Sequence, residues 1–319
     1  MGFLLRTVIL THGDTDGVCS GAMALKAFPG AILHFSKPVG LLEDLSIANE
    51  GDRVIICDIA INEIHCEELV GRLERLSEEG EVFYIDHHPP PRRISRIPGK
   101  VSYSDPDACA SEMTYYTFRD LIPEDMDLVA IFGAVGDYAD RTPGIRRLMD
   151  RWDERLAYME SGILSQAVIM LGRNYDAKRR VIRELVEMHI PSTVDWMLEL
   201  ALKQCRVDLE LREEVKRKLI VLENLAYVVN PHGPLGKAAS FAAAFGHRKV
   251  GVAVEIIKRR GKMLADMSIR ALEDLDLNDL VRELTPKLGG EGGGHSRAAG
   301  ARLPEETFKE FLRYLDSSL

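Results

Sequence analysis

Histidine and aspartate residues occur at alternate positions just after the first apolar run of the chain. Within HGDTDG (12–17), His12, Asp14 and Asp16 are spaced by two residues. Carboxylate oxygens and an imidazole are ligands that suit Mn²⁺ or Mg²⁺. The DTDG pattern is also typical of a turn whose aspartate caps a following helix. Taken alone, this motif leaves a metal site and a capped turn as alternatives.

Two later motifs place aspartates in comparable positions. Asp58 lies near the end of the apolar run DRVIICDIA (52–60), where a lone aspartate often caps the next helix. GAVGDYAD (133–140) offers Asp137 or Asp140 as a ligand. The two glycines before Asp137 would let the backbone approach a neighbour closely. Each of these motifs is again compatible with an ordinary turn.

The triplet Asp86, His87 and His88 gives a stronger signal. It follows VFYI directly and precedes three prolines, which restrict the chain that follows. Ionisable side chains at a partly buried strand end cost free energy unless they are paired or used. The triplet therefore favours a functional site over a purely structural hydrogen-bond network.

These motifs follow the strand-like runs of an α/β domain. Strands are expected at 5–12, 32–36, 52–60 and 81–88, and helices at 18–28 and 65–79. This alternation predicts a parallel sheet covered on both faces, with the ligand site beyond the carboxyl ends of the strands. The acidic motifs then converge on one sheet edge. Two metals about 3.5–4 Å apart would stabilise the attacking and leaving oxygens of an in-line displacement, and Asp58 is the natural bridging carboxylate.

The remainder of the chain changes character at about Asn230. Helices are expected at 108–121 and 126–137, followed by a charged helical region over 144–224. The segment 249–271 predicts two strands around a turn at 259–261, and a final amphipathic helix ends the chain. We expect a parallel-sheet α/β domain over 1–175, a helical connector over 176–225, and a smaller α+β domain over 226–319.

A glycine-rich segment in the second half lies close to cationic side chains. GGEGGGHSRAAG (289–300) combines glycine amides with His295 and Arg297. That combination predicts an anion cradle, with a flexible surface loop as the alternative. Ser268 and Arg270 alternate along the preceding strand and would face the same side.

The bulk composition excludes some classes of protein. The 319 residues carry a net charge of -9, with a pI near 5.6, which argues against a protein that coats long nucleic acid through a broad basic surface. The five cysteines include no CxxC pair, so we expect no disulfide framework and a reducing compartment. No apolar stretch approaches about 18 residues. We expect a soluble, cytoplasmic protein with no membrane partner.

Five motifs together resemble those of a known superfamily. THGDTDG, CDIA, YIDHHPPP and GAVGDYAD, in that order, are similar to the motifs of the DHH phosphoesterase superfamily, and GGGHSRAAG resembles the signature of its DHHA1 domain. The resemblance spans nearly the whole chain. The size is similar to that of the nanoRNases and of short archaeal RecJ-like nucleases, and the compact first motif is closer to the RecJ-like branch.

The resemblance implies a role for each matched residue. Metal ligands are expected at His12, Asp14, Asp16, Asp58, His87 and Asp137. Asp86 would orient His87, and His88 would contact the scissile phosphate. The terminal phosphate or nucleotide of the substrate would be held by Ser268, Arg270, Gly293, Gly294, His295 and Arg297. The metals implied are two Mn²⁺ ions, with Mg²⁺ as the alternative.

The function implied is a phosphodiesterase acting on single-stranded RNA or DNA, as an exonuclease or an oligoribonuclease. A phosphatase or phosphodiesterase of small molecules, acting on a nucleotide such as pAp, on a cyclic dinucleotide or on pyrophosphate, is the first alternative. A replication or repair scaffold is the second alternative. A nuclease could also dock on a replication or repair helicase, and the charged helical segment 176–222 is where we expect such a contact.

Overall fold

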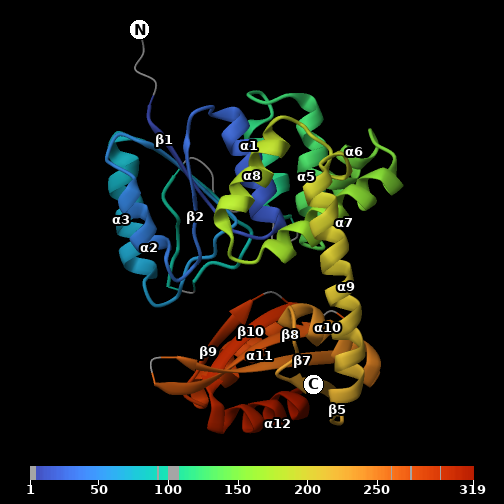
Figure 1. The fold of residues 1–319 in the computed structure, drawn as a ribbon. Coiled ribbons are helices and arrows are strands. Elements are labelled where there is room, and N and C mark those ends of the chain that lie inside the picture. The colour runs from blue at the N-terminus through green and yellow to red at the C-terminus, as the bar shows by residue number, and fades with distance from the viewer. Residues whose placement is uncertain (1–4, 92, 100–107, 260, 274, 295) are drawn as a thin grey trace. The chain divides into compact units, whose positions relative to one another are not determined.

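The computed structural model describes residues 5–91, 93–99, 108–259, 261–273, 275–294 and 296–319. Its internal contacts divide the chain into two units, Met1–Gln204 and Cys205–Leu319 (Figure 1). The boundary falls inside the long helix α9 (Asp195–Lys218), within the segment 176–225 that we expected to be a connector. The predicted three-part division stays a prediction, and each unit is described by itself below.

The first unit is built on a four-stranded sheet. Its strands are β1 (Thr7–Thr11), β2 (Ile32–Phe35), β3 (Arg53–Cys57) and β4 (Glu81–Ile85). All neighbours pair in parallel, in the order β2-β1-β3-β4. Strands β1, β3 and β4 are largely buried, which explains their continuous apolar sequences, whereas the edge strand β2 is partly exposed. The parallel pairing confirms the predicted α/β sheet.

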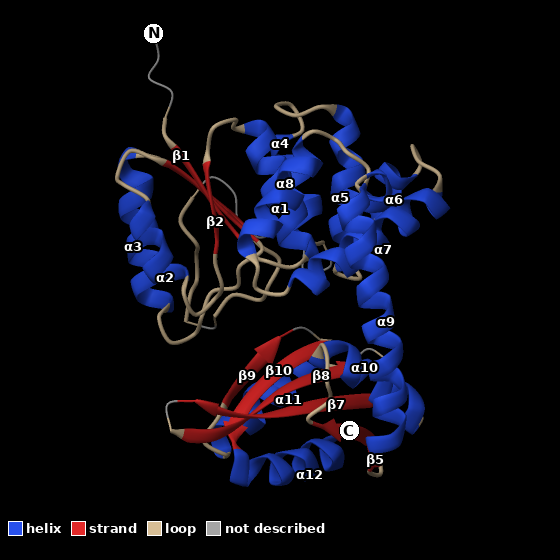
Figure 2. Ribbon diagram, in the orientation of Figure 1, coloured by secondary structure: helices blue, strands red, loops and turns tan. Residues whose placement is uncertain are grey.

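Helices cover both faces of this sheet (Figure 2). One face packs against α2 (Leu41–Asp44) and α3 (Cys66–Glu79), and the other packs against α1 (Thr15–Ala27) and α4 (Ala110–Phe118). The outer helices are α5 (Asp127–Gly136), α6 (Pro143–Met149), α7 (Glu154–Leu171) and α8 (Tyr175–Val186). α8 lies against α1, with Val181, Ile182 and Leu185 in the core of the first unit.

The start of α1 differs from the expected start of that helix. We expected a loop over 12–17 and a helix from residue 18, whereas α1 begins at Thr15. The helix starts early because Asp14 caps it: its Oδ1 accepts a hydrogen bond from the Gly17 amide at 3.0 Å. Asp16 therefore stands in the first turn of a helix, and its side chain is buried.

The second unit contains a six-stranded mixed sheet. Its strands are β5 (Ile220–Val221), β6 (Leu225–Val229), β7 (Val250–Arg259), β8 (Lys262–Ala271), β9 (Glu291–Gly294) and β10 (Ala298–Pro304), in the order β5-β6-β7-β8-β10-β9. Its helices are α10 (Leu235–Gly246), α11 (Leu277–Lys287) and α12 (Phe308–Ser318). β7 and β8 pair antiparallel up to Arg259 and Lys262, which confirms the predicted hairpin. Residues 291–294, expected to be a loop, form an edge strand because β10 pairs with them.

Among the residues that the structure describes, no helix combines the length and the apolar composition needed to cross a bilayer.

Candidate metal centre

The predicted ligands of the first unit gather at the carboxyl edge of its sheet. His12 follows β1 and Asp58 follows β3, while Asp86, His87 and His88 follow β4. Backbone bonds tie these strand ends together: the His12 amide donates to the Cys57 carbonyl at 3.2 Å, and the Asp58 amide donates to the Ile85 carbonyl at 2.9 Å. The parallel ladder thus extends one residue beyond the strands, and it sets the spacing of the side chains.

Three of these residues form what we call the first donor group: His12, Asp14 and Asp58. His12 Nδ1 lies 2.8 Å from Asp14 Oδ2 and 3.6 Å from Asp58 Oδ2. The Asp14 carboxylate raises the pKa of His12 against the opposing effect of burial. Asp14 caps α1 and belongs to this group at the same time, so the helix cap is confirmed and is compatible with the metal site, which stays a prediction. One ligand atom from each residue could converge on a single cation.

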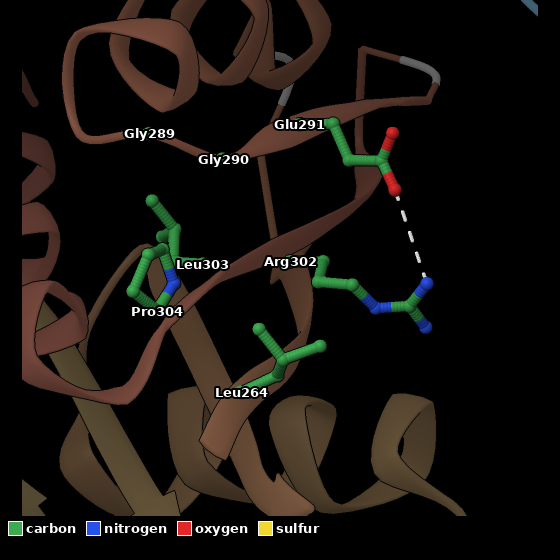
Figure 3. A pocket seen from close by; sticks show the side chains of 7 residues that line it. All are labelled: Leu264, Gly289, Gly290, Glu291, Arg302, Leu303 and Pro304. Atoms are coloured by element: carbon green, nitrogen blue, oxygen red, sulfur yellow. Dashed lines mark ion pairs between the residues drawn. The ribbon is translucent and has the colours of Figure 1, made fainter. Parts of the chain in front are cut away.

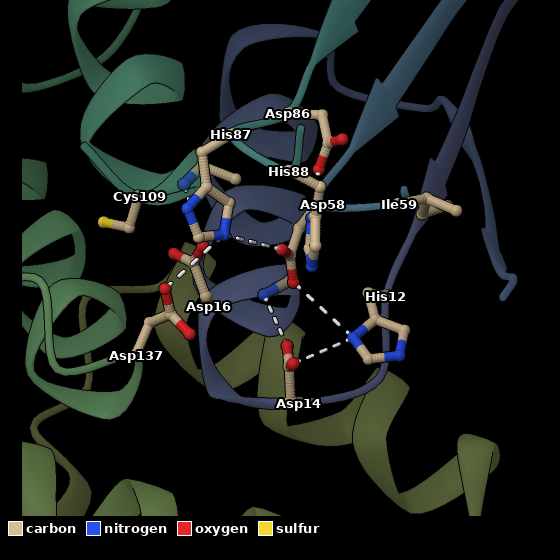
Figure 4. A network of polar contacts seen from close by, with 12 residues as sticks. His12, Asp14, Asp16, Asp58, Ile59, Asp86, His87, His88, Cys109 and Asp137 are labelled. Atoms are coloured by element: carbon tan, nitrogen blue, oxygen red, sulfur yellow. Dashed lines mark hydrogen bonds and ion pairs between the residues drawn. The ribbon is translucent and has the colours of Figure 1, made fainter. Parts of the chain in front are cut away.

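A second donor group consists of Asp16, His87 and Asp137. His87 Nε2 lies 3.4 Å from Asp137 Oδ2 and 3.7 Å from Asp58 Oδ1. Asp58 therefore stands between the groups, with Oδ2 nearest His12 and Oδ1 nearest His87 (Figure 4). All six predicted ligands come together, and their arrangement suits two cations that share one carboxylate.

The ionised carboxylate of Asp58 and its backbone conformation are both unfavourable. Its side chain is 3% exposed, and Oδ2 has no hydrogen-bond donor among the described residues. Its φ is +59°, a left-handed backbone conformation that non-glycine residues adopt rarely. Burial raises the pKa of Asp58 well above its usual range, and the negative charges of Asp14 and Asp16 raise it further. A bound cation would satisfy this carboxylate, so the orphaned oxygen fits a metal-bridging role.

Asp16 is fixed by the start of α4. Its Oδ2 accepts a hydrogen bond from the Ala110 amide and its Oδ1 accepts one from the Ser111 amide, each at 2.8 Å. These two amides are otherwise unpaired donors at a helix start, and the helix dipole favours a carboxylate there. Burial still raises the pKa of Asp16. The contact joins positions 94 residues apart and sets the direction of a predicted ligand.

Gly133 lets α5 pack closely against Ser111 and Asp16. The sequence predicted such a close backbone approach for the glycines before Asp137. A Cβ at position 133 would lie 2.2 Å from Ser111 Oγ and 2.9 Å from Asp16 Oδ1. Side chains in these positions cannot move without breaking the bonds of Asp16 to α4. The glycine is therefore part of the support of the second donor group.

We expect Gly133→Ala to lower the free energy of unfolding by about 1–3 kcal/mol, because the extra methyl overpacks this junction. The second donor group should be disturbed as well, since Asp16 must shift. Gly162→Ala in α7 is the matched control: its Cβ meets no atom within 4 Å, so it should stabilise the helix by about 0.5–1 kcal/mol. Urea unfolding of both variants tests this, and a Gly133→Ala chain as stable as the wild type would contradict it.

Asp86 and His88 form a pair beside the donor groups. Asp86 Oδ1 lies 2.7 Å from His88 Nδ1, so this carboxylate orients the residue expected to contact the scissile phosphate. The sequence also predicts that Asp86 orients His87, and that role stays a prediction. Burial lowers the pKa of His88, the Asp86 carboxylate raises it, and the net shift is upward. His88 also belongs to a third possible metal set with Asp58 and His87.

The structure separates Asp137 from Asp140, which the sequence left as alternatives. Asp137 caps the end of α5 and joins the second donor group. Asp140 Oδ2 accepts a hydrogen bond from the Tyr158 hydroxyl at 2.6 Å and belongs to none of the metal sets formed by the described residues. Asp137 is the candidate ligand.

Lys178 is a residue of this site that the sequence did not reveal. It lies on α8 and is 5% exposed, and its ammonium group donates to the Gly13 carbonyl within the first motif. Burial lowers the pKa of Lys178. A lysine in a charged helical segment predicts a solvent-facing side chain, so only the packing of α8 against α1 discloses its role. It ties the loop between His12 and Asp14 to the helical layer.

The predicted anion cradle lies in the second unit. Strand register places Ala298 beside Arg270, and places Gly300 beside Ser268 on one side and Gly293 on the other. Ser268 and Arg270 share the less buried face of β8, as their alternation predicted. The Gly294 amide donates to Asn278 Oδ1, and an Arg297 amine donates to the Leu272 carbonyl. His295 lies outside the described residues. Anion binding by this set stays a prediction.

A pocket of about 260 Å³ lies at the other end of β10 (Figure 3). Arg302 lines it together with Glu291, Leu264 and Gly290. The Arg302 guanidinium is held by the Asp266 carboxylate through contacts of 2.5 and 2.8 Å. Because a carboxylate already occupies this guanidinium, the pocket is a poor anion site. Its described lining includes none of the residues predicted to bind substrate.

Two family models match the chain. The model of the DHH family, N-terminal domain, matches residues 6–133, and the model of the DHHA1 domain matches residues 225–319. No curated protein sequence matches the chain.

Solved structures resemble the whole chain at low sequence identity. A DHH-domain protein described as a member of a family of ribosomal proteins has a TM-score of 0.70 and 16% identity, over 98% of this chain and 86% of its own. Manganese-bound exonuclease RecJ has a TM-score of 0.59 and 18% identity, over 98% and 89%. PggH from Vibrio cholerae, a pGpG-specific phosphodiesterase, has a TM-score of 0.60 and 15% identity, over 98% of both chains. At these identities the likeness concerns the fold.

Proposed function

Because the chain belongs to the DHH superfamily and carries a DHHA1 domain, we propose that it is a metal-dependent phosphodiesterase of single-stranded RNA, DNA or short oligonucleotides. The proposal includes two cations, Mn²⁺ or Mg²⁺, held by the first and second donor groups. It also includes exonuclease or oligoribonuclease action on a chain end.

The observation that carries this proposal is the position of Asp58. One of its oxygens faces each donor group, and the one facing His12 has no hydrogen-bond donor among the described residues. Carboxylates with a minority of imidazoles are the ligand type that Mn²⁺ and Mg²⁺ accept, whereas thiolate-rich sets select softer metals. Two cations sharing Asp58 would suit a phosphodiester, since they can neutralise both oxygens of an in-line displacement.

The residues around the centre have separate tasks in this proposal. When bound, the cations supply Lewis acidity and lower the pKa of a coordinated water. His88, oriented by Asp86, donates a hydrogen bond to a phosphate oxygen on which charge develops. Asp16 stays directed at the centre because α4 holds both of its oxygens. Lys178 keeps the backbone between His12 and Asp14 in place.

The second unit would bind the end of the substrate. Glycine amides of β9 and the guanidinium groups of Arg270 and Arg297 are donors that suit a terminal phosphate. Ser268, Gly293, Gly294 and His295 complete the set that we propose. This task is separate from bond cleavage, so variants here should change KM before kcat.

RecJ structures of the same fold contain manganese or Mg²⁺, and manganese is the cation that we propose first, with Mg²⁺ as the alternative. A small nucleotide is the second candidate substrate. The PggH likeness extends over 98% of both chains, and that protein is specific for the dinucleotide pGpG. Docking on a replication or repair helicase through residues 176–222 stays a prediction.

A time course on end-labelled RNA and DNA, from dinucleotides to about 20 nucleotides, tests the function. After chelation of metals we expect no cleavage, and Mn²⁺ should restore it, because four of the six proposed ligands are carboxylates that need a cation between them. Faster cleavage of dinucleotides than of longer chains would favour the small-nucleotide candidate. Cleavage that persists in excess chelator, or activity on pyrophosphate alone, would contradict the proposal.

A further inference from the structure

Tyr138 occupies a backbone position that normally belongs to glycine. It follows Asp137 directly and has a φ of +60°. The Tyr138 amide donates to the Val135 carbonyl and the Ala139 amide donates to the Ala134 carbonyl, which is the paired pattern that ends many helices. Glycine is usual at this place because a Cβ is unfavourable there, and a bulky aromatic residue is a clear exception.

The Tyr138 ring is not buried, so packing does not offset the free-energy cost of this backbone conformation. Tyr138 is 90% exposed, whereas an aromatic side chain that serves folding is normally packed. The three helix-ending hydrogen bonds of Asp137, Tyr138 and Ala139 hold the residue in place, so the ring projects from a rigid support. A strained residue that persists beside a functional site motivates a functional explanation.

The surroundings of Tyr138 suit a nucleotide. It lines a cavity of about 290 Å³ with Ala139, Arg141, Thr142 and Pro143. Arg141 is exposed, while the nearby acid Asp140 is engaged by the Tyr158 hydroxyl. An exposed aromatic ring next to a cation is the combination with which proteins bind single-stranded nucleic acid, by stacking a base and attracting its phosphate.

We propose that Tyr138 stacks on the nucleobase adjoining the scissile phosphate and that Arg141 attracts the neighbouring phosphate. This rests on the proposed phosphodiesterase function and names its substrate as a base-bearing nucleotide chain. Consecutive Cα atoms lie about 3.8 Å apart, so the backbone of Tyr138 adjoins that of the ligand Asp137, and for this reason we assign the ring to a base next to the scissile phosphate. Stacking tolerates any base, so the subsite selects for nucleic acid without selecting a sequence.

The test compares Tyr138→Asn with Tyr138→Phe in the full-length, Mn²⁺-loaded chain. Asparagine tolerates a left-handed backbone but has no ring, so folding is preserved, while phenylalanine keeps the ring. On a dinucleotide we expect the asparagine variant to raise KM between about fivefold and about 100-fold, the contribution of one stacked base, with kcat within about twofold. Phenylalanine should keep KM within about twofold. Arg141→Gln should raise KM both on the dinucleotide and on the same dinucleotide without bases, because Arg141 is proposed to attract a phosphate.

The control substrate is the same dinucleotide with abasic sugars. Wild type and Tyr138→Asn should cleave it equally poorly, because the ring then has no base to stack on. A binding readout accompanies the kinetics: the chelated chain, which cannot cleave, is titrated with a dinucleotide that carries fluorescent 2-aminopurine. Its Kd should rise in the asparagine variant by the same factor as KM.

Unchanged KM and Kd in Tyr138→Asn would overturn the stacking proposal, as would an equal loss on the abasic substrate. A wild-type chain that cleaves no phosphodiester at all would overturn the proposed function and the stacking with it. Cleavage by the wild type with unchanged kinetics in the asparagine variant overturns the stacking alone.

Discussion

An Asp58→Asn variant is expected to lose phosphodiesterase activity by about 100- to 1000-fold while its metal-free form becomes more stable. The loss follows from the place of Asp58, whose two oxygens face His12 and His87 in the two donor groups. An amide has one oxygen and no charge, so it cannot bridge two cations as a carboxylate does. Both donor groups are therefore weakened by a single substitution.

The gain in stability follows from the cost of the buried charge. Burial and the charges of Asp14 and Asp16 raise the pKa of Asp58, which means that the metal-free fold disfavours the ionised form. Asparagine removes that charge and is among the residues that best tolerate a φ of +59°. A gain of about 1–2 kcal/mol at neutral pH is the usual size of such an effect.

The pH dependence has a definite sign. A carboxyl group whose pKa is raised in the fold contributes stability below its unfolded pKa of about 3.9, and this contribution is lost as pH rises through the folded pKa. The stability difference between Asp58→Asn and the wild type should therefore be smallest near pH 4 and should grow towards neutral pH. Added Mn²⁺ should reverse the order, since only the wild type binds it tightly.

Thermal unfolding in chelator between pH 4 and pH 8, repeated with Mn²⁺, measures these effects. Asp140→Asn is the matched control, because Asp140 lies three residues from the ligand Asp137 and bonds to Tyr158. It should keep its activity within about twofold. A metal-free Asp58→Asn chain that is less stable than the wild type at pH 7 would show that Asp58 is structural, and full activity would exclude it as a bridge.

The sheet and the order of its motifs could be predicted from the sequence because the three strands that precede the motifs are largely buried. The apolar runs before His12, Asp58 and Asp86 had to be interior strands, and interior parallel strands end at a shared edge. The position of Ser268 and Arg270 on the same face of one strand followed from the alternation of side chains along a strand. These properties depend on local periodicity, which is visible in any short window of residues.

What the sequence could not show depends on contacts between distant segments. The hydrogen bonds from α4 to Asp16 join positions 94 residues apart, and the bond from Lys178 to Gly13 joins positions 165 apart. The left-handed backbone of Asp58 could not be read from the sequence, since aspartate tolerates this conformation better than most residues but adopts it only rarely. Tyr138 is similar: the glycines around it predicted a close backbone approach at Gly133 but not a strained, exposed ring.

Replacing the adjacent residues His87 and His88 by glutamine should affect different quantities: Mn²⁺ affinity for His87 and kcat for His88. His87 is 6% exposed and lies between Asp58 and Asp137, so His87→Gln should weaken Mn²⁺ binding by about tenfold or more. His88 is 26% exposed, and its Nδ1 is engaged by Asp86. His88→Gln should therefore leave Mn²⁺ affinity within about twofold and lower kcat by about 100- to 1000-fold, the cost of one donor to the developing charge.

Mn²⁺ titration followed by electron paramagnetic resonance, with kcat measured at saturating Mn²⁺, separates the two effects. Asp86→Asn is a third variant, which should lower kcat by about 10- to 100-fold through the orientation of His88 while Mn²⁺ binding is kept. Loss of Mn²⁺ binding in His88→Gln would assign His88 to the metal set with Asp58 and His87. In that case the Asp86 carboxylate would support a ligand, and the hydrogen bond to the phosphate would have to come from another residue.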